Sequence, residues 1–404
     1  MNSSINICLV YPGYYPDDFA GGIATYLDEY LNMFKGKNGK VILISRTLNL
    51  KKTIINDKNI EIHRIPTDVN WFIKLINKFT KNKFRMLFYS INLYFYLKRI
   101  KNNKEIDLIE GCDWGAELYY TAKHNLNIPI IVRIHTPSFI SEKYNPGNNS
   151  YLGNYTKKLE RKLLNNENII VVTPDNSIIG EFRKENVIPK NIIYNVCYPL
   201  SKIETNNAKF KELNIMFAGR LEERKGLDTI FYLMNQILIK YKISYIKFNF
   251  YGADTILKNG EKYRDILIQK YKLNNFVNKK IFFYGQVSRT QLLHNMKKMN
   301  IYISASKFEL VGYSALEAIK SGNILIHSGT GFLRKFIRNN KEGYIFKNKD
   351  ELVEIVLNIY SNNLDNIKNI RIKGINKVNE YTERTYLYNK TIKLYKKILN
   401  YKLT

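Results

Sequence analysis

Short runs of consecutive apolar residues recur along the first half of the chain and alternate with longer stretches of helical periodicity. Such a run, bounded by turn residues, is typical of a strand that is buried on both faces. The predicted strands are residues 5–10, 41–45, 106–110, 129–134 and 168–173, and the predicted helices are residues 24–34, 84–101, 114–124 and 154–164. This alternation predicts a doubly wound α/β domain.

A second series of the same kind follows Pro199 and a polar stretch at residues 201–211. Its predicted strands are residues 213–217, 246–251, 280–284, 301–304 and 324–327, and its predicted helices start at residue 227 and span residues 263–271, 290–295 and 313–321. The predicted fold class is therefore α/β, with two Rossmann-like parallel-sheet domains at residues 1–198 and 199–380. Residues 381–403 read as one amphipathic helix, and we expect this terminal segment, residues 381–404, to pack back on the first domain because its apolar stripe must be buried.

The chain carries 64 Lys and Arg against 35 Asp and Glu, a formal net charge of +29, and 45% of its 404 residues are hydrophobic. It is too apolar for a disordered polycation. The charge points to nucleic acid, an anionic membrane or a phosphorylated ligand, or else to compositional drift on solvated faces, since Asn, Ile and Tyr are also abundant. Three isolated cysteines fit a reducing cytosol, so we expect a cytoplasmic protein that touches the inner face of the cell membrane at most peripherally.

Several common ligand motifs are missing from the sequence. GxGxxG, the P-loop, HExxH and Asp-x-Asp are all absent, which argues against the usual dinucleotide and divalent-cation sites. The first alternative signal is Gly21-Gly22, placed between the first strand and the first helix. Glycine lets a backbone approach a ligand closely, and a helix N-terminus attracts anions. A plain loop remains the alternative.

The second signal is the segment at residues 217–226, which joins a strand to a helix in the second domain. Arg220 and Lys225 would stand at the carboxyl edge of the sheet, where α/β folds bind ligands. Two cations at one point suit a diphosphate, because the guanidinium makes forked contacts and the ammonium acts as a point charge. A solvated basic turn is the alternative.

The third signal is a pair of carboxylates eight positions apart. Glu309 follows a strand and Glu317 lies in the next helix, so one can reach a sugar while the other reaches a ribose, because carboxylates accept hydrogen bonds from hydroxyls. Gly312 and Tyr313, at the start of that helix, offer backbone N–H groups to a phosphate. Two surface glutamates capping a helix are the alternative.

Together these segments resemble the retaining GT-B glycosyltransferases of family 4. The similarity rests on the following segments: Gly21-Gly22, residues 110–117, residues 132–137 with His135, Gly219-Arg220 with Lys225-Gly226, Ser306-x-x-Glu309, and Glu309-x7-Glu317. The resemblance implies two domains facing each other across a cleft. It also implies that Arg220 and Lys225 bind the donor diphosphate, Glu317 the ribose, Glu309 the sugar hydroxyls, and that His135 lies near the sugar.

The resemblance further implies transfer of a hexose-type sugar, with retention, from a nucleotide diphosphate sugar to a saccharide or lipid-linked acceptor. The pathway would be cell-surface polysaccharide or glycoconjugate synthesis, with no metal and no other cofactor. Leu310 and Arg334 stand where the family often has a glycine and an acid, so the donor (UDP, GDP or ADP) stays open. A basic nucleic-acid-binding protein and an inactive GT-B scaffold are the alternatives, although no nucleic-acid reader motif is found and we expect no nucleic-acid partner.

Residues 71–83 mix large apolar residues with Lys at helical spacing. Such a segment either lies on an anionic membrane with its aromatic face inserted or packs on the N-terminal sheet. The sequence does not choose between the two.

Overall fold

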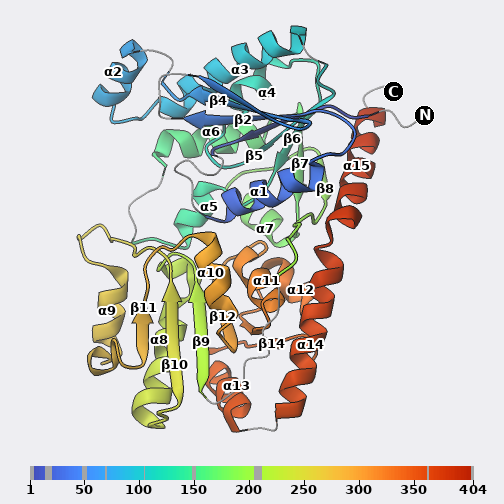
Figure 1. The fold of residues 1–404 in the computed structure, drawn as a ribbon. Helices are drawn as coiled ribbons and strands as arrows, with labels where there is room; N and C mark the ends of the chain where they lie inside the picture. Colours follow the sequence, from blue (N-terminus) through green and yellow to red (C-terminus); the bar gives the residue numbers. More distant parts are fainter. Residues whose placement is uncertain are drawn as a thin grey trace. The chain divides into compact units, whose positions relative to one another are not determined.

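The two series of apolar runs form two parallel sheets, one in each of two units (Figure 1). The structure is a computed structural model that describes residues 4–13, 21–47, 52–68, 71–103, 105–147, 152–203, 212–361 and 364–401. Unit 1 comprises Met1–Ile140, Ser150–Pro199 and Arg384–Thr404, and unit 2 comprises Ser141–Asn149 and Leu200–Glu383. The predicted polar stretch lies partly outside the described residues, as does the end of the predicted terminal helix.

The division differs from the predicted domains in three places. The chain passes from one unit to the next after Pro199 rather than after residue 198, and it returns at Arg384 rather than at residue 381. The segment Ser141–Asn149 belongs to unit 2, although it lies in the middle of the predicted first domain. Its side chains bond to residues far along the chain, which sequence periodicity does not report.

Unit 1 is built on an eight-stranded sheet with the order β3-β4-β2-β1-β5-β6-β7-β8. The strands are β1 (Ile7–Tyr11), β2 (Val41–Thr47), β3 (Thr53–Asp57), β4 (Ile60–Pro66), β5 (Leu108–Cys112), β6 (Ile130–Arg133), β7 (Ile169–Thr173) and β8 (Ile192–Tyr194). All neighbours pair in parallel except β3 and β4, which form an antiparallel hairpin at the edge. The apolar runs did not predict this hairpin, because β3 is exposed along most of its length and β4 alternates apolar with polar residues.

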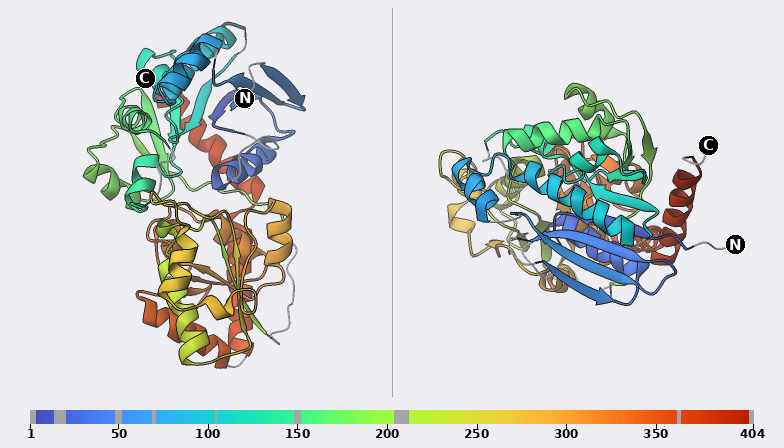
Figure 2. Two further views of the ribbon diagram at one scale, coloured as in Figure 1. Left: turned by 90° about the vertical axis from the view of Figure 1, so that its left-hand side faces the viewer. Right: turned by 90° about the horizontal axis from the view of Figure 1, so that it is seen from above.

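Helices flank the sheet of unit 1 in two groups (Figure 2). The helices of this unit are α1 (Gly22–Phe34), α2 (Trp71–Phe79), α3 (Arg85–Asn103), α4 (Tyr119–His124), α6 (Asn154–Leu164), α7 (Ser177–Lys184) and α15 (Arg384–Tyr401), and α5 (Ser138–Lys143) crosses the boundary into unit 2. α3, α4 and α6 contact one another, and α1 contacts α15. The predicted helix at residues 114–124 begins only at Tyr119, because Gly115 and Ala116 adopt positive φ angles of 82° and 53°.

The terminal helix differs from the single predicted segment. α14 ends at Tyr381 and α15 starts at Arg384, so a turn at Thr382 interrupts the helix. The Thr382 hydroxyl donates to the carbonyl of Val378 at 2.7 Å, and the Thr382 carbonyl accepts from the backbone N–H of Leu200 at 3.3 Å. This turn marks the point where the chain leaves unit 2.

Unit 2 has a six-stranded, all-parallel sheet with the order β11-β10-β9-β12-β13-β14. Its strands are β9 (Leu213–Ala218), β10 (Ile246–Tyr251), β11 (Ile281–Phe283), β12 (Ile301–Ser304), β13 (Ile324–His327) and β14 (Tyr344–Ile345). Its helices are η1 (Glu223–Lys225), α8 (Leu227–Asn235), η2 (Gln236–Lys240), α9 (Tyr263–Lys270), η3 (Asn274–Phe276), α10 (Arg289–Met296), α11 (Tyr313–Lys320), α12 (Gly331–Phe336), α13 (Lys349–Ser361) and α14 (Leu364–Tyr381).

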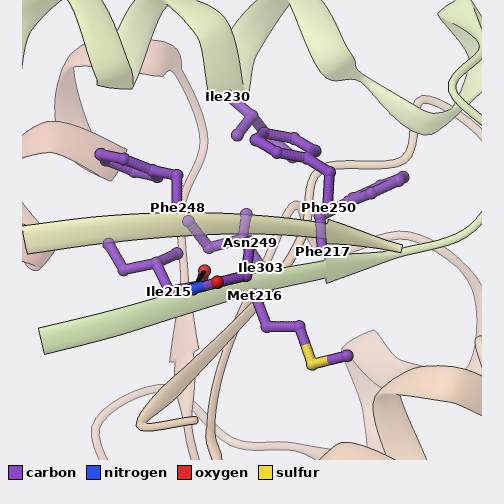
Figure 3. A pocket seen from close by; sticks show the side chains of 8 residues that line it. All are labelled: Ile215, Met216, Phe217, Ile230, Phe248, Asn249, Phe250 and Ile303. Atoms are coloured by element: carbon purple, nitrogen blue, oxygen red, sulfur yellow. Dashed lines mark hydrogen bonds between the residues drawn. The ribbon is translucent and has the colours of Figure 1, made fainter. Parts of the chain in front are cut away.

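The centre of this sheet is packed with aromatic side chains. Phe217 of β9 and Phe250 of β10 lie with ring centroids 5.9 Å apart, beneath Ile230 of α8 (Figure 3). Asn249 precedes Phe250 in β10 and is buried. Its carboxamide oxygen accepts a hydrogen bond from the Tyr284 hydroxyl at 3.2 Å. Aromatic side chains bury large areas and interlock, so β9 gives a rigid base to the loop that follows it.

Candidate active site

The strand order of unit 2 reverses at β9, because the chain runs outward from β9 to β10 and β11 and then returns to β12 on the other side. Ligands of open α/β sheets bind at this kind of switch point, at the carboxyl ends of the strands. The loop after β9, residues 219–226, and the loop after β12, residues 305–312, both start there. Arg220, Lys225 and Glu309 lie on these two loops.

Close packing joins the two loops. The backbone N–H of Lys307 donates to the carbonyl of Arg224 at 2.8 Å. Gly226 has a φ of 69°, and a Cβ atom there would lie 1.8 Å from the carbonyl oxygen of Ala305. Only glycine fits this position, both for its φ angle and for the approach of the neighbouring backbone. The Lys225-Gly226 part of the motif is thus required by the local structure.

The side chain of Lys225 forms an ion pair with Glu309 across the two loops. Arg224 stands beside them, with its Nη1 atom 3.9 Å from Glu309 Oε2 and its Nη2 atom donating to Glu222 Oε1 at 2.7 Å. Burial alone would raise the pKa of Glu309, but the positive charges of Lys225 and Arg224 outweigh it and lower the pKa below its usual value. Glu309 is therefore an ionised acceptor at neutral pH.

Arg224 was not among the predicted site residues, although it lies between Arg220 and Lys225. Its Nη1 also donates to the carbonyl of Phe308 at 3.1 Å, and its buried Nε has no hydrogen-bond partner among the described residues. The motif itself held the signal, because it contains three cations and only two were selected. Arg220 is exposed on the same loop.

Asn145 also belongs to this site, and no sequence signal pointed to it. Its carboxamide oxygen accepts the backbone N–H of Arg224 at 2.7 Å, and the side chain is only 1% exposed. The neighbouring Tyr144 ring stacks on Phe308, with centroids 5.2 Å apart and planes inclined by 17°. The segment Ser141–Asn149 therefore supports both loops from outside the contiguous part of unit 2.

Glu317 lies on α11, the helix that follows the loop after β12. Gly312, with a φ of 73°, precedes this helix, and Tyr313 is its first residue. The Glu317 carboxylate is buried and accepts from Arg289 Nε of α10 at 2.9 Å. The sequence predicted Glu317 but not Arg289, which lies 28 positions away.

The remaining predicted residues lie in unit 1, at the carboxyl ends of β1 and β6. Gly21, with a φ of 129°, caps α1, and Gly22 is the first residue of that helix. A Cβ at either glycine would meet no atom of the described residues within 4 Å. Tyr26 of the same helix contacts the ring of His135, with centroids 4.7 Å apart. The structure thus brings α1 and His135 together through Tyr26.

Asp113 fixes the loop that carries His135. Its carboxylate accepts the backbone N–H groups of His135 at 2.8 Å and of Thr136 at 3.2 Å. The imidazole Nε2 is buried and has no partner among the described residues. Burial, together with the nearby charge of Arg133, lowers the pKa of His135 to about 3, so the ring is neutral at pH 7.

Comparison with known proteins places part of the chain in a family. Residues 201–377, nearly all of unit 2, match the family described as "Glycosyl transferases group 1". This part of the chain belongs to the group 1 glycosyltransferases. The whole chain is similar to an uncharacterised glycosyltransferase of Methanocaldococcus jannaschii, with 24% identity over 409 residues that cover 96% of this chain and 97% of that protein.

Solved structures support the GT-B fold of this glycosyltransferase. The sucrose-phosphate synthase of Thermosynechococcus elongatus superposes with a TM-score of 0.73, at 16% identity, over 98% of this chain and 99% of its own. The Anabaena protein HepE, solved in complex with UDP and glucose, superposes with a TM-score of 0.66, at 12% identity, over 96% of this chain and 99% of its own. The two parallel-sheet α/β units are therefore those of a GT-B fold, as predicted.

In the described part of the chain, no helix is long and apolar enough to cross a bilayer. No group of three His, Cys, Asp or Glu residues in this part is arranged to hold a metal ion.

Proposed function

We propose that this glycosyltransferase moves a hexose-type sugar from UDP-sugar to a saccharide or lipid-linked saccharide, with retention and without a metal. The observation that carries the proposal is the Lys225–Glu309 ion pair beside Arg224 at the switch point of unit 2. Three cations on one loop suit a diphosphate, and an ionised carboxylate suits sugar hydroxyls. The UDP and glucose bound to HepE favour UDP as the nucleotide.

The proposed reaction needs charge stabilisation on the leaving group. The bond between the anomeric carbon and the diphosphate breaks, the acceptor hydroxyl oxygen bonds to the same carbon, and the departing phosphate takes the hydroxyl proton. Arg220, Arg224 and Lys225 would stabilise the charge that develops on the diphosphate, which is the part a divalent cation plays in other sites. Glu317 would bind the ribose, Gly312 and Tyr313 the phosphate through the start of α11, and Glu309 the sugar.

The proposal also assigns roles to His135, Gly21 and Gly22 of unit 1. His135 offers a neutral imidazole whose buried Nε2 has room for a hydrogen bond with the sugar or its phosphate. Gly21 and Gly22 leave the α1 start open to an anionic group. The acceptor would be used in cell-surface polysaccharide or glycoconjugate synthesis.

The proposal is tested by donor turnover. We expect the purified chain to release nucleotide from one UDP-hexose in the presence of EDTA, and the product to show the donor's anomeric configuration by NMR. GDP-hexose and ADP-glucose serve as comparison donors. Turnover that needs added Mn²⁺, or an inverted product, would contradict the metal independence or the retention.

Two single substitutions test the residues. Lys225→Ala and Glu309→Ala should each lower kcat by about 100-fold or more, because each removes an interaction with the charge or the sugar of the transition state. Lys279→Ala, at an exposed lysine elsewhere in unit 2, is the matched control and should keep full activity. Full activity in both site variants would refute the assignment.

A further inference from the structure

Helix α2 exposes its largest apolar side chains. Its one fully buried side chain is Asn77, which donates to Asp68 Oδ1 at 2.7 Å, while Arg85 donates to the other oxygen of Asp68 at 3.2 Å. Ile73 and Ile76 are half-buried, whereas Trp71 is exposed by 71% and Phe79 by 80%. The usual surface helix instead buries its largest apolar side chains.

The exposed apolar side chains form one continuous stripe. Trp71, Leu75 and Phe79 are four positions apart, so they lie one above another on a helix face, and Phe72 widens the same face. Asn77 projects from the other side of the helix. Figures 1 and 2 show α2 at the edge of unit 1. Of the two interpretations of this segment, insertion of the aromatic face into a membrane agrees better with the exposure of Trp71, Phe72 and Phe79. An exposed apolar stripe marks an interaction surface.

Lys and Arg dominate the sequence around this stripe. Residues 69–104 contain nine Lys and Arg residues and no Asp or Glu, and the acid that precedes them, Asp68, is buried and bonded to Asn77 and Arg85. Lys74 and Lys78 project along one edge of the apolar stripe, and Lys81 follows the helix; all three are exposed. A surface with an apolar centre and a basic edge is complementary to anionic lipid headgroups above an acyl layer.

We propose that α2 docks this enzyme on an anionic lipid bilayer. Trp71, Phe72, Leu75 and Phe79 enter the boundary between headgroups and acyl chains, and Lys74, Lys78 and Lys81 contact the lipid phosphates. A second copy of the chain is a poorer occupant, because two such surfaces would bring like charges together. The inference does not depend on the proposed sugar transfer, since it uses no residue of the donor site.

The test measures binding of the full chain to vesicles. We expect co-sedimentation with vesicles of phosphatidylcholine and phosphatidylglycerol, and little with phosphatidylcholine alone. The triple variant Lys74→Glu, Lys78→Glu, Lys81→Glu should bind the anionic vesicles about 100-fold more weakly, since each basic residue near such a surface contributes roughly fivefold. The variant Trp71→Ser, Phe79→Ser should also bind more weakly, and should lose a blue shift of tryptophan emission on vesicle addition.

A control with the same change in net charge separates this site from general attraction of a basic protein. Lys262→Glu, Lys279→Glu, Lys298→Glu alters three exposed lysines of unit 2 and should leave vesicle binding within about twofold of the wild type. Circular dichroism should show that all variants are folded. Equal losses in both triple variants, no binding by the wild type, or a dimer that only the α2 variants dissociate would each overturn the proposal.

Discussion

Burial beside Tyr26, together with the positive charge of Arg133, keeps the imidazole of His135 neutral and lowers its pKa to about 3. Its position is set by Asp113, which binds the backbone on either side of the ring. Such a residue can give or accept a hydrogen bond but brings no charge to a phosphate. In the proposed reaction the positive charge comes instead from Arg220, Arg224 and Lys225.

We predict that the imidazole of His135 stays neutral in the folded chain between pH 8 and pH 5. In NMR spectra of the full chain, the resonance that disappears in His135→Gln should not shift between pH 8 and pH 5. The unfolded chain takes up a proton near pH 6.5 and the folded chain only near pH 3, so this group lowers the free energy of unfolding as the pH falls through that window. In His135→Gln, the free energy of unfolding should therefore fall less steeply between pH 6.5 and pH 3 than in the wild type. A midpoint near pH 6.5 would contradict the prediction.

At the element scale, α15 is held in unit 1 by a buried polar network as well as by its apolar stripe. Arg133 of β6 makes two hydrogen bonds to Glu110 of β5, at 2.8 and 3.0 Å. The Tyr395 hydroxyl of α15 donates to Glu110 Oε2 at 2.8 Å and lies 2.6 Å from the Tyr30 hydroxyl of α1. A buried ion pair is stable only when its remaining hydrogen-bonding capacity is satisfied, so α15 completes the centre of the sheet.

Removal of one hydroxyl tests this network. Tyr395→Phe should lower the free energy of unfolding by about 1–3 kcal/mol, because Glu110 and Tyr30 each lose a buried partner. Tyr386→Phe, on the exposed side of the same helix, is the matched control and should change it by less than about 0.5 kcal/mol. Urea denaturation provides the measurement. Equal effects of the two substitutions would contradict a special role for Tyr395.

At the scale of the whole molecule, the last helix of the chain completes the first sheet rather than the second. Unit 1 is therefore assembled from both ends of the sequence, whereas unit 2 holds its own core between β9 and α14. Of the 64 Lys and Arg residues, three lie on the loop after β9 and nine lie in residues 69–104. The other 52 are distributed over the rest of the chain.

Truncation after Glu383 tests this assembly. We expect the shortened chain to lose hydrogen-exchange protection in β5 and β6, because Glu110 and the apolar side of α1 are then uncovered. Protection in β9, β10 and β12 should stay within error of the full chain. Loss of protection in both units would show that unit 2 does not hold its own core, and no loss in unit 1 would show that α15 is dispensable.

The sequence by itself determined most strands of the two sheets and the segments that carry the candidate site residues. A strand buried on both faces is apolar along its whole length, so these strands were visible as runs. Arg220, Lys225, Glu309 and Glu317 were found because they follow such strands in loops or helix starts. The edge hairpin of β3 and β4 escaped this reasoning, since β3 is exposed and β4 alternates apolar with polar residues.

The tertiary structure decided which of these residues meet and which surfaces stay open. Asn145 reaches Arg224 across 79 positions, and Arg224 reaches Phe308 across 84, distances along the chain at which no local pattern operates. The sequence likewise did not determine whether the apolar face of α2 is covered. Helical periodicity shows that a face is apolar, but not whether another element packs on it. In this protein the buried contacts of Asn77 leave that face uncovered.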